Sequence, residues 1–317
     1  MSSPANAASV TDSLGGHALS LAHMLFNEPP PTDYIFRNLA LVAGTAGLVF
    51  APGDTGKSWL LLEMAVAVAL AGTDLAGGHV SDLLGFQPNP PPRGHLREGK
   101  GWAVVYLTAE DPDNQLHYRL YHIADRLTND QRNLLAENLR VRSWQGDKLL
   151  DVRGEGADRD LIAYCKDSRF VGIDTLTRFH RAEEKDNGEM GQVVNVFERI
   201  GHAGPAVVIA HHDNKAAVAE GSTKQMQAAR GASAIADNLR WGFSLARSAE
   251  DDSLLVGSEG KHSYGSLHSG LWFRRNQFGV LSATATPSPK IGVTDIRTAR
   301  GKRSARNTRG GDDEGIV

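Results

Sequence analysis

Apolar and polar residues alternate along the chain in two different rhythms. Short, nearly continuous apolar runs predict buried strands, and longer segments with apolar residues three or four positions apart predict helices. The expected strands are 46–50, 102–108, 139–143, 170–174 and 206–210, and the expected helices are 57–71, 113–126, 130–137, 158–166 and 189–202. Such alternation predicts an α/β fold with a mainly parallel central sheet and helices on both faces.

This rhythm changes at two places in the chain. Residues 77–101 are rich in proline and glycine, which predicts an insertion on the surface. After residue 240, short extended runs separated by turn residues predict an antiparallel C-terminal extension of the same sheet. These runs are 240–246, 253–259, 271–275 and 280–283.

The two ends of the chain differ from the middle. Residues 1–27 begin with a Ser/Ala-rich stretch, followed by a short expected helix over 17–27, and are predicted to form a flexible arm. Residues 285–317 lack apolar periodicity and are predicted to be a disordered basic tail, which either aids solubility or touches nucleic-acid phosphate. Between the ends, residues 28–284 contain no repeat and no linker, so we expect one domain there.

The composition excludes several classes of protein. Apolar residues make up 41% and charged residues 22%, as in ordinary globular proteins. Cys165 is the single cysteine, which rules out an internal disulfide or a cysteine zinc cluster. The chain has neither the roughly 18–20 consecutive apolar residues of a membrane span nor the start of a signal peptide, so we expect a cytoplasmic protein without a membrane partner. The net charge of -3 argues against a basic coat but permits a local basic groove.

The strongest local motif follows the first expected strand. It matches the spacing of a phosphate-binding P-loop, with alanine at the first position, where glycine is usual. The motif is Ala51-Pro52-Gly53-Asp54-Thr55-Gly56-Lys57-Ser58. Its glycines let backbone amides approach phosphate oxygens at a helix N-terminus. We expect Lys57 to lie against the β- and γ-phosphates of ATP and Ser58 to hold Mg²⁺.

Carboxylates follow two of the other expected strands. Asp174 ends the strand 170–174, where a P-loop protein places the second group of its metal site. Glu110 lies just beyond the strand 102–108 and can orient and deprotonate an attacking water. Asp111 precedes a proline at a helix start, so we interpret it as a structural cap and assign catalysis to Glu110.

Two adjacent histidines, His211 and His212, follow the strand 206–210. Neighbouring side chains on an extended chain point to opposite sides, and no further ligand stands at a fixed spacing, so a zinc site is disfavoured. A polar group at this strand end is placed to sense the γ-phosphate and to pass that state to the next loop. That loop, 213–227, carries Lys215 and Lys224.

Taken together, these motifs resemble the RepA family of hexameric replicative DNA helicases encoded by broad-host-range IncQ plasmids, a branch of the RecA-like ATPases. The resemblance covers roughly residues 28–282. Besides the P-loop it rests on Pro29-Pro30-Pro31-Thr-Asp33-Tyr34, Ala109-Glu110-Asp111-Pro112, His117-Tyr-Arg119-Leu, Asp174-Thr-Leu-Thr-Arg178-Phe-His180, His211-His212, Gln227-Ala-Ala-Arg230-Gly-Ala-Ser, Asp237-Asn-Leu-Arg240-Trp241, Tyr264-Gly265 and Trp272-Phe-Arg274-Arg275.

The resemblance implies roles for single residues. It implies that Lys57 and Ser58 bind ATP and Mg²⁺. Glu110 becomes the catalytic base and Asp174 the metal-site acid. His212 matches the γ-phosphate sensor of RecA-like helicases, and His211 stands beside it.

The resemblance also implies roles for cationic residues. Arg230 fits an arginine finger that reaches the ATP of a neighbouring subunit, the alternative being a surface arginine at a helix start. Arg119 could relay between Glu110 and a neighbour. Loops 178–188 and 213–227 correspond to those that face the central channel of RecA-like rings. The DNA-binding candidates are therefore Arg178, Lys215 and Lys224, and the next finger candidates after Arg230 are Arg274 and Arg275.

The activity implied by the resemblance is ATP-driven translocation on single-stranded DNA, with duplex unwinding during plasmid replication by a homo-oligomeric, hexameric ring. Primase and origin-binding initiator are then separate proteins. Two alternatives remain: a RecA-like recombination ATPase that coats DNA, and a nucleotide-gated oligomeric switch or scaffold. The insertion at 77–101 and the basic tail depart from the family pattern. So does Asp54, which we expect to point outward.

Overall fold

The computed structural model describes residues 19–73, 84–144, 150–184, 186–212, 235, 238–248, 250–264 and 270–286. The chain divides into two compact units, Met1–Asp33 and Tyr34–Val317. In the first unit, helix α1 (Leu21–Phe26) begins after Ser20, whose hydroxyl accepts a hydrogen bond from the amide of His23 at 3.3 Å. This confirms a short helix within 17–27. None of its side chains is buried.

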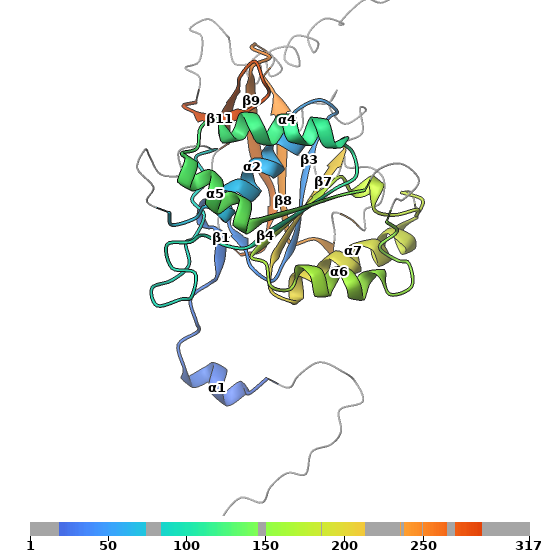
Figure 1. Ribbon diagram of the computed structural model, residues 1–317. Helices are drawn as coiled ribbons and strands as arrows, with labels where there is room; N and C mark the ends of the chain where they lie inside the picture. Colours follow the sequence, from blue (N-terminus) through green and yellow to red (C-terminus); the bar gives the residue numbers. More distant parts are fainter. Residues whose placement is uncertain are drawn as a thin grey trace, which may run out of the picture. The chain divides into compact units, whose positions relative to one another are not determined.

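The described part of the second unit contains a nine-stranded sheet with the order β11-β10-β9-β8-β3-β7-β6-β4-β5 (Figure 1). The six strands from β8 to β5 run parallel to their neighbours, and β9, β10 and β11 continue the sheet in antiparallel fashion. The strands are β3 (Ala46–Ala51), β4 (Val104–Thr108), β5 (Leu139–Ser143), β6 (Phe170–Asp174), β7 (Ala206–His212), β8 (Trp241–Arg247), β9 (Leu254–His262), β10 (Leu271–Arg275) and β11 (Leu281–Thr284). The predicted fold class is confirmed.

Helices cover both faces of this sheet, as predicted (Figure 1). On β7, Val208 and Ala210 pack into one hydrophobic cluster, and Val207 and Ile209 pack into the other, because alternate residues of a strand face opposite sides. The first cluster contains α2 (Lys57–Ala69), α4 (Asp113–Ala124) and α5 (Asn129–Asn138), and the second contains α6 (Ala157–Cys165) and α7 (Asn187–His202).

Helix α2 is buried along almost its whole length. After Lys57 and Ser58 its residues are apolar on every side except for Glu63, which explains why it packs against the middle of the sheet instead of presenting a polar face to water. It contacts β6, β4, β3 and β7. The helix that follows the P-loop is therefore held firmly, and so is the loop at its start. Across the described residues, no helix has the length and apolar character that crossing a membrane requires.

Three expectations about the architecture need correction. Strand β8 pairs in parallel with β3, so the antiparallel extension starts one strand later than predicted. Residues 77–101 are not wholly superficial, since Leu84 and Phe86 are each 1% exposed and belong to the core. The Phe86 ring lies 5.8 Å from that of Phe273, so this apolar pair fills the space over the C-terminal strands.

The third difference is a small sheet that the pattern did not predict. Strands β1 (Tyr34–Phe36) and β2 (Leu41–Val42) pair in antiparallel fashion around the 3₁₀ helix η1 (Arg37–Leu39). They are too short to produce a recognisable alternation of apolar and polar residues. A second 3₁₀ helix, η2 (Leu176–Arg178), follows β6.

Candidate active site

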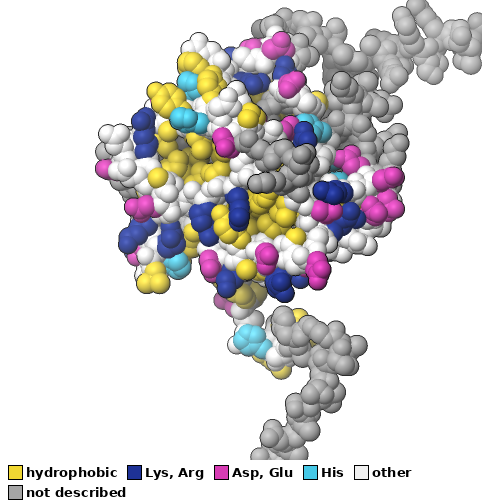
Figure 2. All heavy atoms as spheres, turned by 45° about the vertical axis from the view of Figure 1, so that its right-hand side comes forward, with side chains coloured by type: hydrophobic (Ala, Val, Ile, Leu, Met, Phe, Trp, Pro, Cys, Tyr) yellow, Lys and Arg dark blue, Asp and Glu magenta, His cyan; other side chains and the backbone are white. Residues whose placement is uncertain are grey.

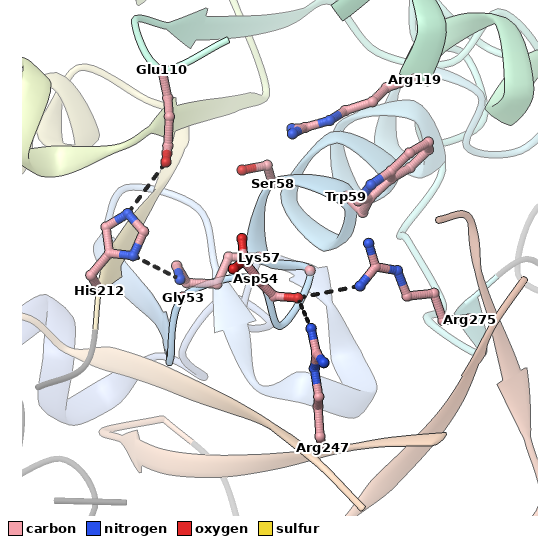
Figure 3. Close-up of a pocket in the computed structure, with 11 residues that line it drawn as sticks. Gly53, Asp54, Lys57, Ser58, Trp59, Glu110, Arg119, His212, Arg247 and Arg275 are labelled. Atoms are coloured by element: carbon pink, nitrogen blue, oxygen red, sulfur yellow. Dashed lines mark hydrogen bonds and ion pairs between the residues drawn. The ribbon is translucent and has the colours of Figure 1, made fainter. Parts of the chain in front are cut away.

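A cavity of about 400 Å³ opens at the carboxyl ends of β3, β4 and β7 (Figure 3). Open α/β sheets bind their ligands at this edge. Two arginines, from β8 and β10, complete the lining. The lining residues are Gly53, Asp54, Gly56, Lys57, Ser58, Trp59, Glu110, Arg119, His212, Arg247 and Arg275.

The P-loop joins β3 to α2, as its sequence predicts. Gly56 stands at the N-terminal cap of α2 with a φ of 115°, a conformation that residues with a side chain rarely adopt. No side chain caps the start of α2 in the described part of the chain, so its first amides remain available to an anion. Asp54 is exposed, has a φ of 59° and lines the pocket, so its expected outward orientation stays a prediction.

Lys57 lies at the centre of the pocket and is only 5% exposed. Its ammonium group donates hydrogen bonds to the carbonyls of Ala51 at 2.9 Å and Pro52 at 3.1 Å. The Nδ1 atom of His212 lies 3.2 Å from the same nitrogen. The two carbonyls are neutral acceptors, and phosphate oxygens would form stronger, charge-assisted bonds with this ammonium.

Asp174 lies behind Ser58 and is 1% exposed. One carboxyl oxygen accepts a hydrogen bond from the Ser58 hydroxyl at 3.0 Å, and the other accepts one from the Tyr106 hydroxyl at 2.8 Å. Burial raises the pKa of Asp174 to about 6. The pairing of a P-loop hydroxyl with a buried carboxylate suits the oxygen coordination that Mg²⁺ prefers, so these two residues fit a metal site.

Glu110 and His212 form the opposite wall of the pocket. The Nε2 atom of His212 lies 3.4 Å from a carboxyl oxygen of Glu110. This interaction with His212 is the main cause of the lowered pKa of Glu110, which therefore stays ionised at neutral pH. Lys57, His212 and Glu110 thus form a continuous chain from the P-loop to the end of β4 (Figure 3).

Arg119, on α4, faces the pocket across Ser58 (Figure 3). Both terminal nitrogens of its guanidinium contact the Asp111 carboxylate, at 2.6 and 3.0 Å, and one lies 4.0 Å from Asp174. Asp111 does not cap α4, because Pro112 occupies the cap position without any side-chain bond. The predicted cap is therefore wrong in detail, and Asp111 instead fixes the direction of Arg119.

His211 does not line the pocket. It is 3% exposed, and burial is the main reason that its pKa falls to about 4. The two histidines face opposite sides of β7, as their adjacency predicted, and this corrects the inclusion of His211 in the catalytic set. Arg178 is exposed at the end of η2, while Arg230, Lys215 and Lys224 lie outside the described residues. Within the described ranges, no group of three or more His, Cys, Asp and Glu side chains is placed to hold a metal ion.

Sequence reasoning missed Tyr106 and Arg247 and gave Arg275 a different role. Tyr106 looked like one more apolar strand residue, although its hydroxyl supports Asp174. Arg247 lies at the end of β8, and nothing in the sequence connects it with the P-loop. Arg275 was noticed only within a motif, as a candidate for acting on a neighbouring subunit. The available signal was position, since Arg247 directly follows the predicted run 240–246 and Arg275 ends the predicted run 271–275.

Comparison with known proteins adds a family to this geometry. The sequence profile of a family described as AAA domain matches residues 14–218, which is more than half of the chain. Among solved structures, the chain is similar to a crystal structure of the RadB recombinase, with 15% sequence identity and a TM-score of 0.45. That match covers 75% of this chain and 90% of the other. The chain belongs to the AAA domain family, and its mainly parallel sheet, P-loop and pocket form an α/β P-loop fold.

Proposed function

We propose that this protein is an ATP-driven DNA helicase of the replicative type, which translocates on single-stranded DNA and unwinds duplex. The observation that carries the proposal is the position of His212. It contacts both Lys57 and Glu110 in the pocket, and it is the last residue of β7 before the segment 213–234, which lies outside the described residues. A side chain in this place can couple the nucleotide to the segment expected to meet DNA.

ATP hydrolysis requires a group that accepts a proton from water and cations that stabilise the phosphates. Glu110 is ionised and reaches into the pocket, so it serves as the base toward the attacking water. Lys57 exchanges its loop carbonyls for phosphate oxygens. Ser58 and Asp174 are the residues that would hold Mg²⁺, which supplies electrostatic stabilisation of the transferring phosphoryl group.

DNA binding is assigned to local sites and not to a broad surface. On the face shown in Figure 2, Lys and Arg side chains are interspersed with acidic and apolar ones, in keeping with the net charge of -3. The exposed Arg178 follows the same strand that ends in Asp174. Lys215 and Lys224 follow His212 in the sequence, so these three cations are the proposed contacts to the DNA backbone.

The proposed assembly is a homo-oligomeric, hexameric ring, and it rests on the resemblance to the plasmid helicases. In that assembly Arg230 would complete the ATP site of a neighbouring subunit, while primase and initiator would be separate partners. Mixing Arg230→Ala with Lys57→Ala subunits tests this arrangement. ATPase activity should return on mixing, because an intact P-loop can then meet an intact arginine. Continued inactivity with demonstrated subunit exchange would place the finger elsewhere.

Strand displacement is the direct test of the activity. The purified chain, given MgATP and a forked duplex, should release the labelled strand, and Lys57→Ala should not. Electron microscopy of the same sample with a non-hydrolysable ATP analogue should show closed rings. Filaments on DNA without strand release would favour the recombination ATPase. An ATPase rate indifferent to single-stranded DNA would favour the nucleotide-gated switch.

Salt dependence tests the proposed DNA contacts. Each lost phosphate contact should make the slope of log affinity against log salt shallower by roughly one unit. The double variant Lys215→Ala/Lys224→Ala should therefore show a slope shallower by roughly two units, measured by fluorescence anisotropy on a labelled oligonucleotide. An unchanged slope would move the DNA path away from this segment.

A further inference from the structure

Two arginines distant in sequence converge on one backbone oxygen of the P-loop. The guanidinium of Arg247 donates to the carbonyl of Asp54, and that of Arg275 donates to the same oxygen at 3.2 Å (Figure 3). Both side chains line the pocket. The C-terminal strands β8 and β10 therefore hold the tip of the phosphate-binding loop within a single chain.

The position of Arg275 is fixed by the turn and strand that follow it. The amide of Leu281 donates to Glu63 at 2.8 Å, and the Leu281 carbonyl accepts from Arg126 at the same distance. Arg126 also pairs with Glu63 at 2.6 Å. The segment from β10 to β11 is thus anchored to α2, the helix that starts at the P-loop.

Gly279, in the turn between β10 and β11, lets this segment pack directly against Trp59. Gly279 has a φ of 105°, and a Cβ atom at this position would lie 2.6 Å from Cε2 of Trp59, so only glycine allows the contact. Trp59 itself lines the pocket. Arg275 consequently reaches the P-loop from a rigid platform, not from a loose terminal strand.

The pocket is lined by more cationic than acidic side chains, which favours an anionic ligand. Four cationic side chains line it, Lys57, Arg119, Arg247 and Arg275, against the acidic side chains of Asp54 and Glu110. Burial lowers the pKa of Arg275, and repulsion by Arg247 and Arg119 lowers it further. A carbonyl oxygen is a neutral partner for two guanidiniums, whereas phosphate oxygens offer charge-assisted bonds that are roughly twice as strong.

We propose that Arg247 and Arg275 bind the phosphates of the nucleotide held by their own chain, exchanging the Asp54 carbonyl for phosphate oxygens when ATP enters. This inference rests on the proposed ATPase function and extends it to the C-terminal strands. The exchange frees the tip of the P-loop from β8 and β10, and the two arginines then link these strands to the nucleotide. The arginines act in cis, unlike the finger expected from a neighbouring subunit.

The chain provides a matched control in Arg274. It is adjacent to Arg275 on β10 and faces the opposite side of the strand, where its guanidinium contacts Asp251 at 3.4 Å and Ser253 at 2.9 Å. Arg274 does not line the pocket. Arg274→Ala removes the same charge from the same strand without touching the P-loop.

Calorimetric titration with MgATP and MgADP tests the proposal. Arg275→Ala and Arg247→Ala should each weaken ATP binding about 10- to 100-fold, and ADP binding less, because ADP carries fewer phosphate oxygens. Arg275→Lys should fall between wild type and alanine, since it keeps the charge but loses the planar fork. Arg274→Ala should weaken ATP binding far less than Arg275→Ala, because Arg274 lies outside the pocket of its own chain. Thermal unfolding should show that all four variants are folded.

The possible failures of this experiment are distinguishable. If the wild-type chain binds MgATP and Lys57→Ala does not, the nucleotide site stands; wild-type affinities in both Arg247→Ala and Arg275→Ala then overturn the inference alone. If the wild-type chain binds no MgATP, the inference and the proposed function fall together. Mixing Arg275→Ala with Lys57→Ala subunits provides the second measurement. ATPase activity should stay at the level of Arg275→Ala, and its recovery on mixing would show action in trans and overturn the inference.

Discussion

Two carboxylates in this protein are similarly buried but have different roles: one supports the fold, and the other lies at the candidate active site. Glu63, in the middle of α2, is 2% exposed, and Asp174, at the end of β6, is 1% exposed. Burial raises the pKa of Glu63 to about 7 and that of Asp174 to about 6. A raised pKa by itself therefore does not separate a structural carboxylate from a functional one.

What separates the two carboxylates is the completeness of their partners. Glu63 has a guanidinium, that of Arg126 at 2.6 Å, and a backbone amide, that of Leu281 at 2.8 Å. Asp174 accepts hydrogen bonds from two neutral hydroxyls, and the guanidinium of Arg119, which lies 4.0 Å away, is paired with Asp111. The first site is satisfied within the chain, while the second leaves room for a cation next to a phosphate pocket.

The largest expected effect concerns the pocket side of this comparison. Glu110→Gln should bind ATP but lose turnover by about 10²- to 10⁴-fold, because an amide cannot accept the proton of water. Thermal stability should change little, and steady-state ATPase with calorimetric ATP binding checks both. Asp111→Asn is the matched control. Normal turnover in Glu110→Gln together with an inactive Asp111→Asn would show that the two acids were assigned in the wrong order.

The next effect concerns Glu63, the structural carboxylate, and should appear in the free energy of unfolding. Glu63→Ala leaves the guanidinium of Arg126 without its partner and the amide of Leu281 without its acceptor. Breaking such a buried pair should lower the free energy of unfolding by about 3–5 kcal/mol, measured by urea titration. Glu63→Gln should lose less, since its amide oxygen can still accept from Leu281. A loss below about 1 kcal/mol in Glu63→Ala would contradict the anchor.

The third prediction concerns Lys57 in the pocket: Lys57→Ala should lose ATPase activity while the chain still folds. Loss of the ammonium removes charge stabilisation of the phosphates and should lower turnover by at least about 10²- to 10³-fold. The fold should persist, because the hydrogen bonds from the lysine amine to the carbonyls of Ala51 and Pro52 lie within the P-loop, while the hydrophobic side chains of α2 stay in the core. Circular dichroism and ATPase assays check the two parts. Near-wild-type ATPase in the folded variant would remove the nucleotide assignment.

The smallest effect is a change in the pH dependence of stability. Asp174 has a pKa of about 6 in the folded chain, above its ordinary value of 3.8, so the folded state binds the proton more tightly than the unfolded state. Its contribution to stability is therefore present below pH 4 and is lost as the pH rises through 6.

Asp174→Asn should remove this loss. Above pH 6 the variant should gain up to about 3 kcal/mol relative to wild type, while Mg²⁺-dependent ATPase falls. Urea titrations at pH 4 and pH 8 give the comparison, and Glu63, present in both proteins, cancels from the difference. An identical dependence of unfolding free energy on pH in the two proteins would show that burial does not raise the pKa of Asp174 as predicted.

Local sequence predicted those elements whose signals lie within a few neighbouring residues. The strands 139–143, 170–174 and 271–275 have the predicted bounds. Lys57 and Ser58 start α2 as the P-loop motif requires. Glu110, Asp174 and His212 gather at one edge because each lies at or just beyond the carboxyl end of a parallel strand, and these ends meet there.

Contacts between distant segments were beyond the reach of the same reasoning. Leu84 and Phe86 are core residues inside a segment whose prolines and glycines predict surface. Tyr106 supports Asp174 across neighbouring strands. Arg275 reaches Asp54 across 221 positions of sequence, and no local pattern records such a pairing.

The sequence by itself determined the order of strands and helices, the phosphate-binding loop and the acids near it, because apolar periodicity and loop chemistry are local properties. Only the tertiary structure decided which buried acid is satisfied, which histidine faces the pocket and which arginines meet the P-loop. These outcomes depend on strand order and on the packing of β10 and β11 against α2, where partners far apart in sequence complete each other's hydrogen bonds and charges.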